Sequence, residues 1–348
     1  MWSFFQVDSG AITSYYSFIN SFLAPYAPPY QGFLAALVAI AVFVVLMSVL
    51  FSVFAYLFGW LERKVMARMQ SRHGPTYVGK WGILQNLADL IKLMSKENIV
   101  PANSDSAVFL SAIPLLMAIF VFSLMFIPVT SGFVGVNVSV SLVLVFMLLS
   151  LSPLLVFLTG WTSGNKFSSI AAQRSVIMVL SYEIPIILVI AAVALLANSY
   201  DFESIVASQS SLWFIALMPI GFIVFFIAML AELERPPFDL READSELIAG
   251  WLTDVSAPYY GLVLFLDYTR MFVGALLISI LFLGGWNGPV LPQFVWMMIK
   301  VVSISFLVII VRATTVRMRL DRLLRIGWTY LMPLAVVNLC LAFVLFVG

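Results

Sequence analysis

Eight apolar runs, each of about 20 residues or more, constrain this chain more than any other feature of its sequence. A helix needs about 20 apolar residues to cross a membrane, and lipid admits only helices and closed barrels, because every backbone polar group must be paired there. The sequence therefore predicts an all-α integral membrane protein with about eight transmembrane helices in one membrane domain. The expected spans are residues 33–60, 107–127, 139–160, 173–197, 212–232, 258–284, 293–312 and 328–347.

The composition supports this prediction and excludes one class of partner. Of the 348 residues, 63% are hydrophobic and only 10% are charged, whereas soluble domains carry roughly 25% charged residues. We therefore expect a multi-pass protein of the cell membrane. A net charge of +1 argues against nucleic acid as a partner, because a phosphate backbone requires a strongly basic face.

Lysine and arginine predict the orientation, since they are enriched in cytoplasmic loops. If the amino terminus lies outside, the inner loops with their adjoining helix ends hold 16 of the 18 basic residues, and the outer segments hold none. The other two, Arg270 and Lys300, lie within predicted spans. Both termini are thus expected on the non-cytoplasmic side, and the functional surface on the cytoplasmic side.

The chain is expected to hold no redox centre and no metal of its own. It has one cysteine, Cys340, and one histidine, His73. An iron–sulfur cluster is normally held by four thiolates or a mixture of cysteine and histidine, and membrane haems commonly use axial histidines. Electron carriers that need such ligands must therefore be held by partner proteins, whereas a cofactor held without side-chain ligation would leave no trace in the sequence.

The first inner loop predicts an amphipathic helix from Trp81 to Lys96. Its apolar side chains recur every three to four residues, while Asp89, Lys92 and Lys96 share the opposite face. A helix lying on the membrane surface with no further role is the alternative interpretation.

The third inner loop is strongly acidic. Six carboxylates next to a bilayer face desolvation and mutual repulsion, which both raise pKa values and favour proton sharing. This pattern predicts a proton site, and the alternative is a solvated loop that docks a basic partner. The carboxylates are Glu232, Glu234, Asp239, Glu242, Asp244 and Glu246.

Other charged residues fall inside predicted spans. Glu183, in the fourth span, is a functional candidate because a carboxylate inside a membrane is costly; a neutral hydrogen-bonded state or a pair with Arg174 is the alternative. Asp267 and Arg270 lie one helical turn apart and predict an ion bridge. Lys300, alone in its span, is either part of a proton path or a lysine that snorkels to the interface.

The last inner loop is basic. It is suited either to anionic lipid headgroups or to docking a soluble partner protein. Its arginines are Arg312, Arg317, Arg319, Arg322 and Arg325, with Asp321 between them.

Four segments together resemble the H-subunit family of respiratory Complex I, the mitochondrial subunit 1 type. The first inner loop carries Glu62-Arg63-Lys64, Gln70 to Pro75, and the pattern from Leu84 to Glu97. The fourth span carries Ser181-Tyr182-Glu183-Ile184-Pro185. The acidic loop matches at Glu232, Arg235, Pro237 to Leu240, Glu242, Ser245 to Leu247, Ala249 and Gly250, and the last loop at Arg312, Arg317, Arg319, Asp321, Trp328 and Pro333.

The resemblance implies a membrane anchor subunit of a proton-translocating dehydrogenase. Its partners would be iron–sulfur and flavin subunits of a peripheral arm on the cytoplasmic side, antiporter-like membrane subunits, and lipids. The acceptor cavity would be bordered by Arg63, Arg72, Asp89, Lys92 and Phe238. The proton path would contain Glu183, Glu232, Asp239, Glu242, Asp244 and Glu246, with Arg174, Arg235, Arg312 and Arg317 as counter-charges.

Departures from the family pattern bear on the electron donor and acceptor. They stand at Thr76, Lys80, Asn86, Met178 and Val316. They resemble the coenzyme F420-dependent dehydrogenases of methanogenic archaea, whose lipid-soluble acceptor is methanophenazine. An NADH- or ferredoxin-fed relative that reduces a quinone is the other possibility. An anchor for a membrane-bound hydrogenase and a freestanding ion transporter are the remaining functional hypotheses.

Overall fold

The computed structural model describes residues 31–242 and 244–347, and this part of the chain consists of helices joined by loops, without a β-sheet. This confirms the predicted all-α class. The amino-terminal segment, for which an outward position was predicted, lies outside the described residues. The longer helices are α2 (Gln31–Met69), α3 (Gln85–Met94), α4 (Ser106–Ser123), α6 (Ser152–Thr162), α7 (Lys166–Ala197), α10 (Pro219–Glu232), α12 (Ala257–Phe282), α13 (Gln293–Thr314) and α15 (Met332–Val347).

Shorter helices and helical turns complete the described chain. They are η2 (Lys80–Gly82), α5 (Ser141–Leu149), α8 (Phe202–Ser208), α9 (Phe214–Leu217), α11 (Asp244–Leu247), η3 (Gly250–Leu252), α14 (Leu320–Arg325) and η4 (Ile326–Leu331). The helices α5 and α6 together form one membrane-length segment, as do α14, η4 and α15. Pro153 explains the first break, because proline has no N–H to continue the hydrogen bonds of α5.

Seven helical segments in the described chain are long and apolar enough to cross a membrane, which agrees with a multi-pass protein. The fifth predicted span, residues 212–232, forms the shorter apolar helix α10 after the single turn α9. Met218, with φ −129° and ψ 63°, separates the two, and Pro219 begins α10. Its 14 residues extend about 21 Å at 1.5 Å per residue, less than the roughly 30 Å of a hydrocarbon core.

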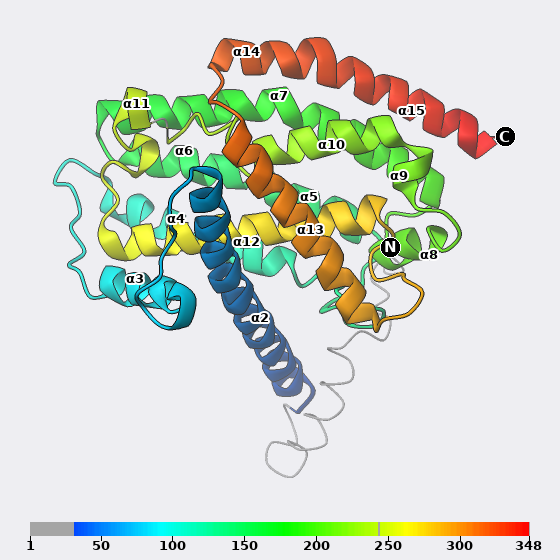
Figure 1. Ribbon diagram of the computed structural model, residues 1–348, viewed down its shortest axis with the longest axis horizontal. Helices are drawn as coiled ribbons and strands as arrows, with labels where there is room; N and C mark the ends of the chain where they lie inside the picture. Colours follow the sequence, from blue (N-terminus) through cyan, green and yellow to red (C-terminus); the bar gives the residue numbers. More distant parts are fainter. Residues whose placement is uncertain (1–30, 243, 348) are drawn as a thin grey trace.

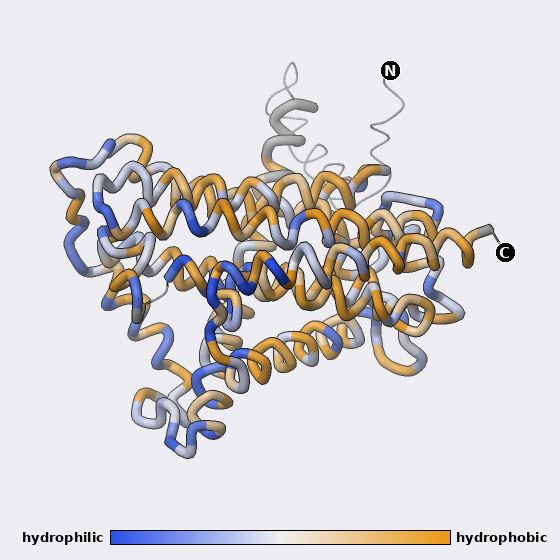
Figure 2. Tube along the Cα trace, turned by 90° about the horizontal axis from the view of Figure 1, so that it is seen from above, coloured by the Kyte–Doolittle hydropathy of each residue, from blue (hydrophilic) through white to orange (hydrophobic). Residues whose placement is uncertain are grey.

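Two helices form the centre of the bundle (Figure 1). The helix α12 packs against α2, α4 and α13, and every residue from Thr269 to Phe282 is buried. The helix α7 packs against α6, α10 and α15. Figure 2 shows hydrophobic residues along the long helices and hydrophilic ones at the end that carries α3 and α11. The charged residues described below lie at this end.

The helix α2 is longer than its predicted span. It continues from the apolar run through Glu62 to Met69, so residues assigned to the first inner loop are helical. Glycine at position 59 lets α12 approach this part of α2 closely, because a Cβ there would meet Tyr268 Cε2 at 3.1 Å and Asn86 Nδ2 at 2.7 Å. The extension brings Glu62 and Arg63 alongside α12 and α3.

Candidate functional site

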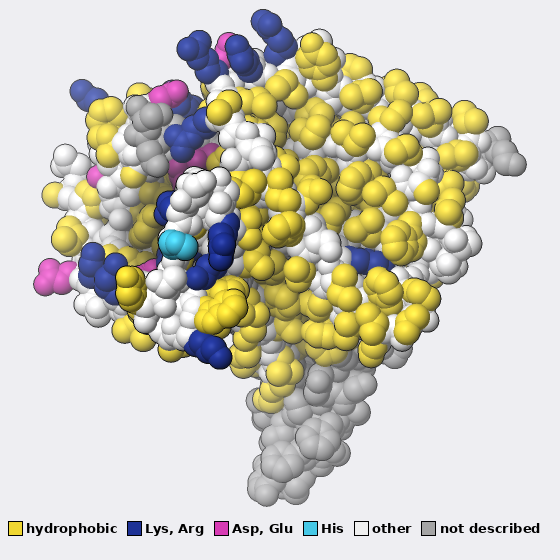
Figure 3. Space-filling view, in the orientation of Figure 1, with side chains coloured by type: hydrophobic (Ala, Val, Ile, Leu, Met, Phe, Trp, Pro, Cys, Tyr) yellow, Lys and Arg dark blue, Asp and Glu magenta, His cyan; other side chains and the backbone are white. Residues whose placement is uncertain are grey.

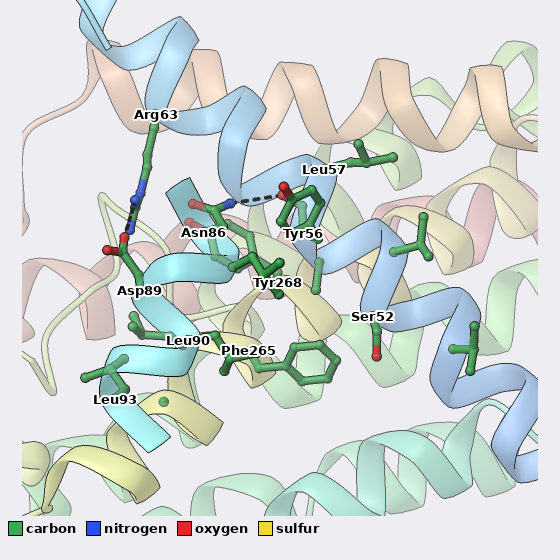
Figure 4. A pocket seen from close by; sticks show the side chains of 16 residues that line it. Ser52, Tyr56, Leu57, Arg63, Asn86, Asp89, Leu90, Leu93, Phe265 and Tyr268 are labelled. Carbon is green, nitrogen blue, oxygen red and sulfur yellow. Dashed lines mark hydrogen bonds and ion pairs between the residues drawn. The ribbon is translucent and has the colours of Figure 1, made fainter. Parts of the chain in front are cut away.

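An apolar cavity of about 600 Å³ lies between α2, α3 and α12 (Figure 4). Its walls are mostly aliphatic and aromatic, and Arg63, Asn86 and Asp89 stand at one end. The lining residues are Val49, Ser52, Val53, Ala55, Tyr56, Leu57, Arg63, Asn86, Leu87, Asp89, Leu90, Leu93, Gly261, Leu264, Phe265 and Tyr268. We call this space the apolar cavity.

Polar contacts hold α3 against α2 at the wall of this cavity. Asn86 Nδ2 donates to the Tyr56 carbonyl at 3.0 Å, as drawn in Figure 4. The Tyr56 hydroxyl donates to the carbonyl of Ile83. Trp60 Nε1 donates to the Trp81 carbonyl at 3.1 Å. No residue of α3 is buried, so these contacts, rather than a packed core, position the helix.

Arg63 and Asp89 form an ion pair at the polar end of the apolar cavity, with 2.6 Å between Arg63 Nη1 and Asp89 Oδ2 (Figure 4). Gln85 Nε2 donates to the other carboxylate oxygen at 3.0 Å. Partial burial raises the pKa of Asp89, but the hydrogen bonds from Arg63 and Gln85 outweigh it, so this pKa lies below its ordinary value. Asp89 is therefore an anion at neutral pH.

A second, polar cavity of about 190 Å³ lies under the loop between α10 and α11. Charged side chains of both signs line it, together with Tyr260 and Tyr268. The charged residues are Glu234, Arg235, Asp239, Arg241, Glu242, Asp267 and Arg312. We call this space the polar cavity.

Buried Glu62 contacts two arginines beside the polar cavity. Arg235 Nη1 lies 3.0 Å from Glu62 Oε1, and Arg312 also donates to this carboxylate. Glu62 is only 3% exposed. Burial lowers the pKa of Arg235, but the charges of Glu62 and then Asp267 outweigh this effect and raise it above its ordinary value. These contacts join α2, the acidic loop and the end of α13 through charge pairs.

A second buried cluster surrounds Glu234. Its carboxylate pairs with Arg241 and lies 2.5 Å from Arg270 Nη1. The predicted ion bridge between Asp267 and Arg270 is wrong, because no such pair occurs among the described residues. The reason is tertiary: the loop after α10 brings Glu234 against Arg270, and Asp267 instead faces the polar cavity.

Four of the six predicted proton-path residues fall into two groups. Asp239, which pairs with Arg317 at 2.9 Å, and Glu242 line the polar cavity. Glu232 instead lies at the end of α10, where it accepts a hydrogen bond from Tyr182. Glu183 is near enough to Glu232 to influence it electrostatically.

Glu246 and Arg174 form a separate pair, with 2.6 Å between Arg174 Nη1 and Glu246 Oε2. The alternative pair of Arg174 with Glu183 is therefore wrong. Asp244 begins α11, and its side chain lies outside the part of the chain that the structure describes.

Glu242 is a carboxyl of the acidic loop whose pKa its surroundings perturb clearly. Burial raises its pKa to about 7, and the neighbouring charges of Asp267 and Asp239 act in the same direction. A carboxyl with this pKa exchanges protons near neutral pH.

The five residues predicted to border an acceptor cavity differ in their positions. Arg63 and Asp89 line the apolar cavity. Arg72 lines a third cavity of about 420 Å³ with Glu62, His73 and Arg312. Lys92 is exposed on α3 and Phe238 is buried in the core, and neither lines any of the three cavities. Lys92 lies on the polar face of α3, which is exposed. The ring of Phe238 is apolar and packs in the core.

Sequence reasoning left Glu62 and Tyr268 out of the candidate site. Glu62 belongs to the Glu-Arg-Lys motif, but it was assigned to a loop because the apolar run ends near residue 60. Tyr268 stands next to Asp267 inside a span. The adjacent polar residues Asp267 and Tyr268 inside an otherwise apolar span were the sequence signal that could have indicated Tyr268.

Lys300 is buried, at 5% exposure. Its Nζ donates to the carbonyls of Leu283, Gly285 and Asn287 at 2.6, 2.7 and 2.9 Å, and lies 4.6 Å from the Trp213 ring centroid. The ammonium group is therefore held by the loop that follows α12.

The arginines of the last loop divide between two directions. Arg312 and Arg317 contact Glu62 and Asp239, whereas Arg319, Arg322 and Arg325 are exposed or partly exposed and take no part in these pairs. Figure 3 shows basic side chains at the edge occupied by α14, next to a broad hydrophobic surface.

Comparison with known proteins gives consistent matches along the chain. The family described as NADH dehydrogenase matches residues 22–343. Three similar proteins are named as the H subunit of NADH-quinone oxidoreductase. That of Carboxydothermus hydrogenoformans is 38% identical over 282 residues, 80% of this chain and 81% of the relative. That of Dehalococcoides mccartyi is 40% identical over 282 residues (80% and 79%), and that of Bacillus cytotoxicus 41% over 286 (80% and 86%).

Proposed function

The chain belongs to the NADH dehydrogenase family, and from this premise we propose that it is the membrane anchor subunit of a proton-pumping oxidoreductase related to Complex I. The family membership confirms the resemblance to Complex I that the sequence motifs indicate. In this role the chain forms the cavity for a lipid-soluble electron acceptor and the beginning of the charge path that couples acceptor reduction to pumping.

The position of the apolar cavity carries the proposal. Val49, Val53 and Leu57 line the cavity, yet each is 47–57% exposed on the outer face of α2. On a membrane helix, this face meets lipid. The cavity therefore adjoins the hydrocarbon region, from which a lipid-soluble molecule can enter without crossing water. Its volume of about 600 Å³ lies within the usual range for small-molecule sites.

The polar end of the apolar cavity suits the head of such an acceptor. Arg63 and Asn86 supply N–H donors, and Asp89 supplies a fixed negative charge. A quinone carries carbonyl oxygens that accept hydrogen bonds, so donors at one end of an apolar cavity orient it. The relatives' name, NADH-quinone oxidoreductase, favours a quinone over methanophenazine and NADH over coenzyme F420 as the donor to the complex.

The polar cavity supplies the coupling part of the proposal. Reduction of a quinone to a neutral quinol takes up two electrons and two protons, and protons withdrawn from nearby side chains change the charge beside the apolar cavity. The carboxylates of the polar cavity respond by shifting protons, and Glu242 is suited to this because its pKa is raised to about 7. Glu183, Glu232, Asp239, Asp244 and Glu246 are proposed to continue the path.

Partner subunits complete the enzyme under this proposal. The iron–sulfur and flavin subunits bind on the cytoplasmic side, where the long first inner loop exposes Tyr77 and Trp81 at 99% and 68%. Antiporter-like membrane subunits bind laterally. The loops on the opposite side of the membrane carry no lysine or arginine, which agrees with this orientation.

Gly261 offers a test of the acceptor cavity. A Cβ at this position would meet Leu93 Cβ at 3.4 Å, an ordinary contact, so Gly261→Ala is tolerated. Gly261→Leu would extend a branched side chain into the apolar cavity. In the assembled complex we expect Gly261→Leu to raise the quinone KM roughly tenfold, a loss of about 1.4 kcal/mol in binding.

The controls separate the cavity from the rest of the complex. Gly261→Ala should keep the quinone KM within about twofold of the wild type, because its methyl group makes only an ordinary contact with Leu93. Twofold corresponds to about 0.4 kcal/mol in binding. Oxidation of the donor by ferricyanide, which does not need the membrane cavity, should be equal in all three complexes. A wild-type quinone KM in the assembled Gly261→Leu complex would contradict the proposed acceptor site.

A further inference from the structure

Tyr268 lies where three cavities meet. It lines the apolar cavity, the polar cavity and the third cavity that Arg72 and His73 border. Among the described residues, no other is shared by the linings of all three. Figure 4 shows its side chain beside Asn86, at the polar end of the apolar cavity.

The Tyr268 side chain contacts both clusters that surround it. Its hydroxyl donates a hydrogen bond to Glu62. Its ring lies under the Arg235 guanidinium, whose Cζ is 5.3 Å from the ring centroid. One side chain therefore touches both members of the buried ion pair between Glu62 and Arg235.

The ring also packs closely against α2. A Cβ at Gly59 would lie 3.1 Å from Tyr268 Cε2 and 3.2 Å from Cζ. Glycine at this position provides the space that the ring occupies. Displacement of the ring is thus restricted on the α2 side, and movement is easier toward one of the cavities.

We propose that Tyr268 is the positioning residue through which occupancy of the apolar cavity changes the contacts of Glu62 and Arg235. An acceptor head at the polar end of the apolar cavity contacts the wall to which Tyr268 belongs. A shift of the ring alters its hydrogen bond to Glu62 and its contact with Arg235 together. A ligand can shift the position of a side chain only if its contacts differ between the two positions. Tyr268 meets this condition because it borders the apolar cavity on one side and the Glu62–Arg235 pair on the other.

Leu264 provides a comparison within the structure. It is the other residue that lines both the apolar and the polar cavity. It lies one helical turn before Tyr268 on α12, but its side chain has no polar atom. If the partition between the cavities were only a steric wall, truncation of Leu264 and loss of the Tyr268 hydroxyl would affect coupling alike.

The inference rests on the proposed function, and the experiment uses the whole complex in proteoliposomes. The quinone KM and the number of protons pumped per quinone reduced are measured for Tyr268→Phe, Leu264→Ala and Tyr259→Phe. Rates are normalised to the iron–sulfur EPR signal of the assembled complex. Tyr259, on the same helix, lines none of the three cavities.

Tyr268→Phe retains the ring and removes only the hydroxyl. The ratio of pumped protons to reduced quinone should fall to about half or less. Leu264→Ala should change the quinone KM and leave this ratio unchanged, and Tyr259→Phe should change neither.

The outcomes separate this inference from the proposed function. A wild-type complex that pumps, together with a Tyr268→Phe complex that pumps equally well, would overturn the inference alone. An equal fall in the number of protons pumped per quinone in Leu264→Ala would also overturn it, because a purely steric partition between the cavities would then explain the coupling. A wild-type complex that reduces no quinone would overturn the proposed function and the inference with it.

Discussion

Arg235 Nη1 lies 3.0 Å from Glu62 Oε1, although 173 positions separate the two residues in the chain. Both side chains are at least nine-tenths buried. Removing one partner of a buried ion pair leaves an uncompensated charge, at a cost of about 3–5 kcal/mol. Since Arg235 and Arg312 both contact Glu62, its replacement leaves two arginines without this partner.

The first prediction therefore concerns stability. Glu62→Gln should lower the free energy of unfolding by about 3–5 kcal/mol, measured by thermal unfolding of the purified complex. Asp89→Asn is the matched comparison, because its pair with Arg63 has side chains that are 25% and 41% exposed. That variant should lose less than about 1 kcal/mol. Equal losses would contradict the assigned difference between a buried and an exposed pair.

The second prediction concerns pH and Glu242. Its pKa rises from the ordinary value of 4.5 to about 7 in the folded protein. Between these values the folded state holds a proton that the unfolded chain has lost, so this group favours folding at low pH. The contribution is complete below pH 4.5 and is lost as the pH rises through about 7.

The variant Glu242→Gln stays uncharged at every pH and removes this dependence. At about pH 8.5 the buried Glu242 of the wild type is ionised and destabilises the fold, so the variant should resist heat inactivation better than the wild type. At about pH 5.5 Glu242 is protonated, so this advantage of the variant should be smaller. Inactivation half-lives of the two complexes at both pH values provide the measurement. A difference that is the same at both pH values would refute the raised pKa.

The third prediction separates stability from coupling at Glu246. Its pair with Arg174 is partly exposed, with side chains that are 53% and 24% accessible, so Glu246→Gln should cost less than about 1 kcal/mol of stability. If Glu246 belongs to the proton path, fewer protons are pumped per quinone while quinone reduction continues. Glu97→Gln, an exposed carboxylate outside the acidic loop, is the control. Full pumping with full quinone reduction in Glu246→Gln would exclude the proposed role.

The fourth prediction concerns Lys300, which donates to three backbone carbonyls near the ends of α12 and α13. Lys300→Met leaves these acceptors without their donor, and an unsatisfied buried polar group costs about 1–3 kcal/mol. Thermal unfolding should therefore show a loss of at least about 2 kcal/mol, with the quinone KM unchanged. Lys166, which is not buried, offers a control, since Lys166→Met should alter stability by less than about 0.5 kcal/mol. An unaffected Lys300→Met complex would contradict the structural role of this lysine.

The membrane spans could be predicted from the sequence because the lipid acts on each segment locally. A run of apolar residues must be helical wherever it crosses hydrocarbon, whatever it packs against. The seventh predicted span, 293–312, differs from α13 (Gln293–Thr314) by two residues at one end. The fifth was less predictable. Pro219 marks the start of α10 in the sequence. The close packing of Gly221 against Asn338 of α15, where a Cβ would meet Nδ2 at 2.7 Å, is a contact between helices and cannot be predicted from one segment.

The acidic loop and the family membership could also be recognised from the sequence, because they depend on residue types at short spacing. The partners of the charges could not. A carboxylate has similar affinity for any nearby arginine, so its choice depends on which elements the fold brings together.

The sequence alone therefore determined the helical class, the membrane location, the family and the segments that carry charge. Only the tertiary structure decided that Glu62 meets Arg235 and Arg312, which are 173 and 250 positions away, and that Arg270 takes Glu234 rather than Asp267. It also decided that Tyr268 borders three cavities. The physical reason is range: burial in lipid is set residue by residue along one helix, whereas ion pairs and cavities exist only between helices.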